Sequence, residues 1–406
     1  ESAAALYVVP FALLFCVLGG VPGAWNELRT RQPGPHLLLL VWIAALIAAQ
    51  AFTVPKGWHW NRYLMPVYAF LFPLLAVGVA RVGRLVESVW PELEPPHGAR
   101  AIGGALLLLA LPGTVFFVLA FGRNCADIRF MHIELAERLN AGDPATPRLL
   151  GLHDAGALAY FSEFPTLDLE GLTDAEFREA ARLGAAGVWE RLESLPAGRR
   201  PDVLAATPVW FDAVFFRPHS LAAVQRLYRP SIVAGNPMNV YLADWSLAGA
   251  GDLPRDPALA GRLAGKTLRL TLDVADVTSE QIAGYSYRIL DGAYEDLLRL
   301  LRSADGAEIM DGGRMISGSE RFRVEGLDAG RDLLLVARTH APFRLWVETS
   351  EGSAGIWSEG GEANGWRETA FVIPGRLVSG TSTDLRIGSD DPHHSAYGSF
   401  HYWVYQ

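Results

Sequence analysis

The sequence predicts a membrane α-helical region of about four spans, followed by a small α/β domain and a C-terminal antiparallel, jelly-roll-like β-sandwich. Four uncharged apolar stretches fill the first third of the chain, helix and strand patterns alternate in the middle, and a period of two residues dominates from about Lys266 onward. We expect a transmembrane region at residues 1–123, an extracytoplasmic α/β domain at 124–248 and the β-sandwich at 260–406.

The membrane region is indicated by four stretches that contain no Asp, Glu, Lys or Arg. Each approaches the roughly 20 apolar residues that a helix needs to cross a hydrocarbon core about 30 Å thick. No such stretch returns after Gly122. We therefore expect a multi-pass membrane protein with spans at Ser2–Gly23, His36–Val54, Tyr63–Ala80 and Ala101–Gly122.

The orientation follows from the basic residues in the short loops, because cytoplasmic loops carry an excess of Lys and Arg. The loops after the first and third spans carry Arg29, Arg31, Arg81, Arg84 and Arg100, whereas the short loop between the second and third spans carries Lys56 and Arg62. This comparison places the C-terminal domains outside the cytoplasm. Because the chain starts at Glu1 inside a hydrophobic segment, without a basic leader, we expect it to be the C-terminal part of a longer polytopic protein.

Composition and missing motifs exclude several functional classes. The net charge of −9 argues against nucleic acid as a partner, since such a protein needs a basic face to displace counterions. The sequence also lacks a Walker-type phosphate loop, a Gly-x-Ser-x-Gly elbow and a His-Glu-x-x-His helix. Nucleotide hydrolysis, serine hydrolysis and zinc proteolysis therefore have no support.

The middle of the chain alternates between short helices and short strands, which is typical of an α/β domain. Helices are predicted at Ile128–Leu139 and Ala157–Phe161, and Thr173 begins another with a carboxylate three residues later. The predicted strands are Arg148–Leu152, Asp202–Ala205 and Asn239–Ala243.

The last third alternates apolar and polar residues, as strands of a sandwich do. In Thr267–Val274 the four apolar side chains fall on one face. Further strands are predicted at Phe343–Val347, Phe371–Ile373, Asp384–Ile387 and Phe400–Tyr405, and Tyr294–Arg302 is predicted to be one inserted helix.

The segment Trp58-His59-Trp60-Asn61-Arg62-Tyr63-Leu64-Met65-Pro66 lies at the outer edge of the membrane, between the second and third predicted spans. An aromatic-Arg-Tyr-x-x-Pro element that opens a late span resembles the C-type, polytopic glycosyltransferases. The segments Leu152–Ser162 and Leu167–Leu172 are similar to the soluble region after the last span of bacterial mannosyl- and arabinosyltransferase-like members. The resemblance covers roughly residues 1–246, and the terminal sandwich is similar in general terms to carbohydrate-binding jelly rolls.

The resemblance implies that Arg62, with Tyr63, His59 and Lys56, binds the phosphate of a polyprenyl-phosphate sugar donor. A guanidinium can hold such a phosphate through two charge-assisted hydrogen bonds, and it would stabilise the charge that grows on a leaving phosphate. The alternative is an interfacial aromatic belt with snorkelling basic side chains. Members of this family carry their acidic catalytic residue in the first outer loop, which has no counterpart here, so the catalytic residue is unknown.

Two other groups of residues are candidates for ligand contacts. His153, Asp154, Asp168 and Glu170 follow predicted strand ends, where α/β proteins often place ligands, and they could contact the acceptor. Helix capping is the alternative role for the aspartates. Asp390, Asp391, His393 and His394 could bind a divalent cation or form a polar hairpin loop, and no cofactor or metal site is established.

Four tryptophans of the sandwich could either stack on sugar rings or pack in the core: Trp346, Trp357, Trp366 and Trp403. The functional hypothesis is the C-terminal portion of an integral-membrane glycosyltransferase at the outer face of a bacterial inner membrane. Its partners would be membrane lipids, the lipid-linked sugar donor and a glycan, lipid or protein acceptor of the cell envelope. The alternative is a non-catalytic, membrane-anchored glycan-binding protein.

Overall fold

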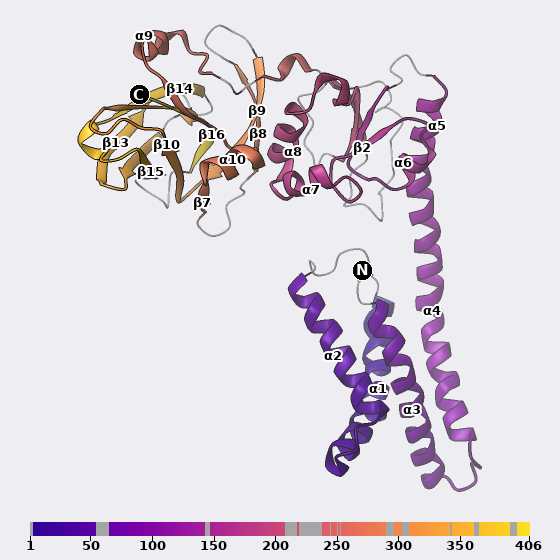
Figure 1. The fold of residues 1–406 in the computed structure, drawn as a ribbon. Helices are drawn as coiled ribbons and strands as arrows, with labels where there is room; N and C mark the ends of the chain where they lie inside the picture. The colour runs from indigo at the N-terminus through magenta and orange to yellow at the C-terminus, as the bar shows by residue number, and fades with distance from the viewer. Residues whose placement is uncertain are drawn as a thin grey trace. The chain divides into compact units, whose positions relative to one another are not determined.

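The computed structural model describes residues 3–53, 65–142, 147–207, 217–218, 238–243, 245–249, 251, 253–289, 296–302, 308–341, 343–360, 365–389 and 396–406. The chain divides into two compact units, Glu1–Ala126 and Asp127–Gln406 (Figure 1).

The first unit is helical. Its helices are α1 (Ala3–Thr30), α2 (Pro35–Thr53), α3 (Met65–Val89) and α4 (His97–Ile128). Helices α1 and α3 cross where Gly19 meets Gly78: a Cβ atom on Gly19 would lie 1.9 Å from the Leu74 carbonyl oxygen. Glycine is therefore required at this crossing, because any side chain would force the two backbones apart.

The N-terminal part has the apolar helices that the sequence predicts. Three described helices are long and apolar enough to cross a membrane, at Pro35–Phe52, Met65–Val89 and His97–Asn140. The first predicted span lies in α1, a helix of 28 residues. Many large apolar side chains of these helices are exposed, as expected for surfaces that face lipid.

The second unit begins with a small α/β domain. Its mixed sheet has the strand order β2-β1-β3-β5-β4, in which β2, β1 and β3 run parallel and β5 is antiparallel to β3. One face is covered by η2 and α5 through Met131 and Leu135, and the other by α7 and α8 through Phe177 and Trp189. The elements are η2 (Arg129–Ile133), α5 (Glu134–Asn140), β1 (Leu150–Leu152), α6 (Ala157–Phe161), β2 (Thr166–Asp168), α7 (Ala175–Arg182), α8 (Gly184–Glu193), β3 (Val203–Ala206), β4 (Arg217–Pro218) and β5 (Asn239–Leu242).

The rest of the second unit is an antiparallel β-sandwich, as predicted. One sheet has the order β13-β12-β15-β10-β7, and the other has the order β14-β11-β16-β9-β8, with β6 paired to β16 (Figure 1). The core between the sheets contains Phe322, Tyr402 and Val404. The strands are β6 (Leu268–Asp273), β7 (Ser286–Arg288), β8 (Asp296–Arg302), β9 (Glu308–Ile316), β10 (Ser319–Glu325), β11 (Leu333–Ala341), β12 (Phe343–Thr349), β13 (Gly352–Glu359), β14 (Gly365–Ile373), β15 (Ser382–Ser389) and β16 (Tyr397–Tyr405).

The helix predicted at Tyr294–Arg302 is wrong, because β8 (Asp296–Arg302) is a strand paired with β9. Its leucines do not alternate with polar residues, since both faces of the strand are covered. Leu297 packs with Phe400 on one face, and Leu298 joins the core formed with α8 on the other. A strand buried on both sides has the same apolar pattern as a buried helix.

Strands β8 and β9 join the sandwich to the α/β domain through α8. The Asp296 carboxylate accepts hydrogen bonds from the backbone N–H groups of Ala185 and Ala186, both at 2.8 Å, and so caps the start of α8. The Trp189 indole donates to the Met310 carbonyl at 3.1 Å. These bonds fix the sandwich and the α/β domain against each other.

Candidate functional site

The predicted donor site lies outside the described residues. This applies to Lys56, His59, Arg62 and Tyr63. The candidate cation ligands Asp390, Asp391, His393 and His394 also lie outside them. Both assignments therefore stay predictions.

In the α/β domain, two predicted residues meet at the carboxyl end of the parallel strands. His153 follows β1 and Glu170 follows β2, and Nε2 of His153 lies 2.9 Å from Oε1 of Glu170. The imidazole is 1% exposed, whereas the carboxylate is 42% exposed. A buried histidine thus lies within hydrogen-bond reach of a surface carboxylate, a distance at which a proton can pass between the two groups.

The other two predicted residues, Asp154 and Asp168, have different surroundings. Asp154 lies near the buried His132 of η2, with 3.6 Å between Oδ2 and Nε2. Sequence reasoning missed His132, since it fits a helical pattern. Asp168 instead accepts hydrogen bonds from the backbone N–H groups of Glu170 and Thr173 and from the Thr173 hydroxyl. Its carboxylate closes the loop after β2, but it does not cap α7, whose N-cap residue is Asp174.

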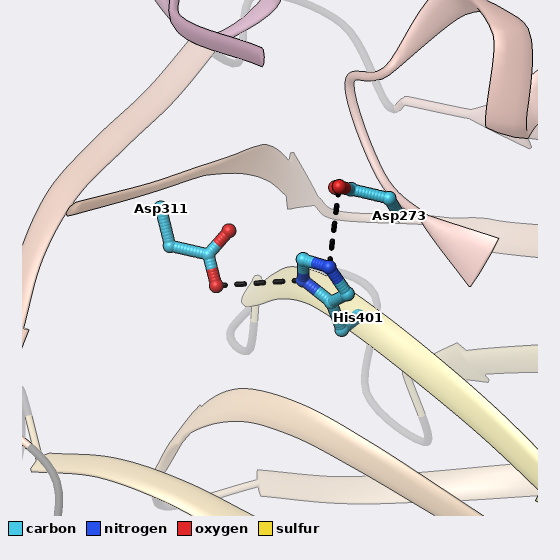
Figure 2. A group of neighbouring side chains, drawn as sticks. All are labelled: Asp273, Asp311 and His401. Carbon is cyan, nitrogen blue, oxygen red and sulfur yellow. Dashed lines mark ion pairs between the residues drawn. The ribbon is translucent and has the colours of Figure 1, made fainter. Parts of the chain in front are cut away.

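The sandwich contains a buried ionic cluster that the sequence did not reveal. Asp273 ends β6, Asp311 lies on β9 and His401 lies on β16 (Figure 2). Nε2 of His401 is 3.2 Å from Asp273, and Nδ1 is 3.4 Å from Asp311. Burial alone would lower the pKa of His401, but the two carboxylates outweigh it and raise the pKa to about 9. The ring is therefore protonated at neutral pH.

Arg338 extends this cluster on the next strand. Its Nη1 atom donates to Asp311 at 2.7 Å and its Nη2 atom to Glu368 at 2.8 Å, and all three side chains are fully buried. The Trp403 ring stacks on the His401 ring at 5.2 Å and lies 5.1 Å from the Arg338 guanidinium. Two buried cations thus face the carboxylates of Asp311, Glu368 and Asp273.

The same three groups, Asp273, Asp311 and His401, each offer one atom that could ligate a metal, and these atoms lie within 4.8 Å of one another. An imidazole must lose its proton before it binds a metal. The carboxylates hold a proton on His401, so the proton competes with any ion here. We interpret the cluster as a structural ion-pair network.

The α/β domain adds one carboxyl group to the surroundings of this cluster. Oε1 of Glu190 on α8 accepts a hydrogen bond from the backbone N–H of Gly312 at 2.7 Å. A Cβ atom at Gly312 would lie 2.6 Å from this oxygen and 2.9 Å from the backbone carbonyl oxygen of Ala186, so glycine is required there. Burial, followed by the charges of Asp273 and Asp311, raises the pKa of Glu190 well above its usual range.

We expect Glu190→Gln to stabilise the fold at pH 8 by on the order of 1 kcal/mol, with no gain at pH 4. The folded state holds the Glu190 proton more tightly than the unfolded state, so the wild type loses stability as pH rises above the ordinary glutamate range. Glutamine cannot ionise, and its carbonyl can still accept from Gly312. Urea unfolding at both pH values measures the difference. Glu179→Gln on the exposed face of α7 is the control, and an equal effect of both changes would contradict this account.

The outer face of the β13-β12-β15-β10-β7 sheet carries a half-buried tryptophan. Trp346 on β12 lies opposite Gly388 on β15 and Ile356 on β13. A Cβ atom at Gly388 would come within 2.3 Å of the Trp346 ring, so the missing side chain lets the indole pack against the sheet backbone. The indole N–H donates to the Ser389 carbonyl at 3.1 Å, which fixes the ring orientation.

A depression of about 330 Å³ lies on this sheet, lined by Tyr287, Arg288, Arg321 and Arg386 among others. The Arg386 guanidinium lies over the Trp346 ring, 5.6 Å from its centre, so the depression and the indole are neighbours. The floor includes Glu320, whose carboxylate accepts hydrogen bonds from the hydroxyls of Tyr285, Tyr397 and Tyr402 and from Ser399. These four hydrogen bonds fix the position of the Glu320 carboxylate.

Of the other three sandwich tryptophans, two are buried in the core and the third has a side chain outside the described part of the chain. Trp357 and Trp403 are 3% and 0% exposed, so they pack in the core and cannot stack on a sugar. The side chain of Trp366 lies outside the described part of the chain.

Comparisons with known proteins relate the two parts of the second unit to different groups. The family described as "Domain of unknown function (DUF8728)" matches residues 126–266. No curated protein matches the chain.

Among solved structures, the chain is similar to the C-terminal CBM6 of a laminarinase from Zobellia galactanivorans (15% identity, TM-score 0.21, covering 34% of this chain and 98% of that one). It is also similar to a CBM35 from Paenibacillus barcinonensis (12%, TM-score 0.18, 35% and 92%). A third is a CBM6 from Clostridium stercorarium in complex with cellobiose (13%, TM-score 0.18, 29% and 90%). These scores are low, and the β-sandwich assignment rests on the strand pairing of the chain itself.

Proposed function

We propose that this protein is a membrane-anchored glycan-binding protein, in which the outer face of the β13-β12-β15-β10-β7 sheet holds a sugar chain outside the cytoplasm. The observation that carries the proposal is the fixed Trp346 indole beside the arginine-lined depression. A sugar ring has an apolar face that packs on an aromatic ring and hydroxyl groups that need hydrogen-bond partners at its edge. Trp346 supplies the first requirement and Arg386 the second.

Preorganisation supports this assignment. The Trp346 ring is fixed by its bond to Ser389 and by the sheet backbone at Gly388, so little side-chain freedom remains to be lost on binding. The apolar helices of the first unit supply the membrane anchor, and the distribution of basic residues supports an extracytoplasmic sandwich.

The glycosyltransferase hypothesis is the finer alternative. It depends on Arg62 as the phosphate-binding residue and on an acidic residue that the chain does not show. Its sequence motif is compatible with donor binding and the His153–Glu170 pair with acceptor contact, but we propose glycan binding without catalysis.

We expect Trp346→Ala to weaken oligosaccharide binding about tenfold or more, because it removes the aromatic surface on which the sugar packs. The measurement is isothermal titration calorimetry of the full chain in detergent with neutral and acidic oligosaccharides. Tyr160→Ala is the matched control, since Tyr160 is an aromatic side chain of the α/β domain that is 83% exposed.

The control variant should bind as the wild type does, and Trp346→Ala should remain folded, with a lower unfolding temperature because it loses the packing and the hydrogen bond of the indole. If Trp346→Ala folds normally and binds every oligosaccharide as tightly as the wild type, the assignment to this face is wrong. If the wild type binds no oligosaccharide at all, the function itself is wrong.

A further inference from the structure

Charge on the outer face of the β13-β12-β15-β10-β7 sheet is opposite in sign to the charge of the whole chain. The chain has a net charge of −9. On β7, β10, β12 and β15, however, the outward positions of this sheet carry more arginines than carboxylates. The arginines are Arg288, Arg321, Arg323, Arg344 and Arg386, and the acidic residues are Glu325, Glu348 and Asp384.

Three of these arginines line the depression beside Trp346. Arg321 and Arg386 lie directly opposite each other on paired strands, and Arg288 lies on the next strand along. Like charges placed directly opposite each other destabilise a sheet. Arg321 is balanced by Asp384 at 2.7 Å and Arg386 by Glu348 at a longer 3.4 Å. Among the described residues, Arg288 has no ion pair.

The lining of the depression therefore has surplus positive charge and many donors. Each guanidinium carries five N–H donors and no acceptor. The acidic side chain in the lining is Glu320, and tyrosine hydroxyls already occupy its carboxylate from the core side. A neutral sugar would satisfy these donors only through hydroxyl oxygens, whereas a carboxylate or a phosphate would pair with them bidentately.

We infer that the ligand of this face is an anionic glycan, in which a carboxylate or phosphate group on one sugar occupies the pocket of Arg288, Arg321 and Arg386. A neighbouring sugar ring then packs on Trp346. This inference rests on the proposed function and specifies the chemical class of its ligand.

The test compares an acidic oligosaccharide with a neutral one of the same backbone. Calorimetry on the full chain in detergent would use hexagalacturonate, its methyl ester, a phosphorylated mannose oligosaccharide and inorganic phosphate. The variants are Arg288→Gln and Arg323→Gln, because Arg323 lies on the same face, pairs with Glu325 and does not line the pocket. Each variant removes one positive charge from the same sheet.

We expect Arg288→Gln to weaken binding of one acidic oligosaccharide about tenfold, and Arg323→Gln to change it less than about threefold. The methyl ester should bind weakly and be insensitive to both changes. Whichever of hexagalacturonate and the phosphorylated oligosaccharide binds identifies the source of the anion. Affinity for it should fall as salt is raised.

The outcomes separate this inference from the proposed function. If the methyl ester binds as tightly as the acid, and Arg288→Gln changes neither while Trp346→Ala weakens both, the face binds neutral glycans and the anionic class is wrong. If inorganic phosphate alone binds through Arg288 and no oligosaccharide binds, the site is a phosphate site and both proposals are wrong. Equal losses for Arg288→Gln and Arg323→Gln would mean non-specific charge attraction and would overturn the pocket assignment.

Discussion

Replacing Arg338 by Met should lower the free energy of unfolding by about 3–5 kcal/mol, the range measured when one partner of a buried ion pair is removed. Arg338 is fully buried, and its guanidinium bonds to the buried carboxylates of Asp311 and Glu368. Methionine keeps an unbranched apolar stem but has no guanidinium, so it leaves two negative charges away from water with fewer donors. The measurement is urea unfolding of the full chain in detergent, followed by tryptophan fluorescence.

Two further variants test the cause of this loss. Arg323→Met removes an exposed arginine from the other sheet and should change stability by less than about 0.5 kcal/mol. Glu368→Gln added to Arg338→Met should recover part of the loss, since one unpaired charge disappears. Recovery should be partial because Glu368 also accepts hydrogen bonds from the backbone N–H groups of Arg255 and Asp256. A loss below about 1 kcal/mol for Arg338→Met would show that the pairing contributes little.

The stability of the second unit should fall by about 3.5 kcal/mol as the pH rises from 6.5 to above 9, because His401 loses its proton. Its pKa is about 9 in the folded state, against 6.5 for an unperturbed histidine. This difference corresponds to about 3.5 kcal/mol at about 1.4 kcal/mol per pH unit. The folded state binds this proton more tightly, so the contribution is complete below pH 6.5 and disappears as the pH passes 9.

His401→Gln provides the comparison. Glutamine cannot titrate, so the variant should be less stable than the wild type at pH 6 and should show a flatter dependence between pH 6.5 and 9. Unfolding at several pH values in urea measures both slopes. Glu190→Gln removes one of the carboxyl titrations that change stability above the ordinary range of a carboxyl group, and the double variant separates its effect from that of His401. The pKa values of Asp273, Asp296 and Glu320 are also raised by burial, and their titrations remain in all the variants. If His401→Gln keeps the full wild-type slope, His401 does not cause the pH dependence.

Local sequence patterns were sufficient to predict the fold class. Apolar length indicates the membrane helices, and the alternation in β10 and β12 follows directly from one buried and one exposed sheet face. The pattern failed at β8, where α8 covers the second face, so the environment of this strand depends on a helix distant in sequence. No pattern within a short window can show that.

The candidate sites were also predicted only where local sequence determines which residues lie close together. His153, Asp154, Asp168 and Glu170 were predicted as one group because they follow strand ends, and the structure brings His153 and Glu170 within 2.9 Å of each other. The cluster of Asp273, Asp311 and His401 was not predicted, because its members come from separate strands that only strand pairing brings together. Trp346 and Trp403 look equivalent in sequence, but the first lies on an outer face and the second is buried.

The bonds between α8 and the β8–β9 pair limit how the sandwich can move against the α/β domain. A binding module on a loose tether would search a wide volume around its anchor. Here the hydrogen bonds of Asp296 and Trp189 hold the two domains of the second unit together. A sugar chain bound to the sandwich would therefore lie at a fixed distance and angle from the His153–Glu170 pair. The second unit would then hold a bound sugar chain in one fixed orientation relative to its α/β domain.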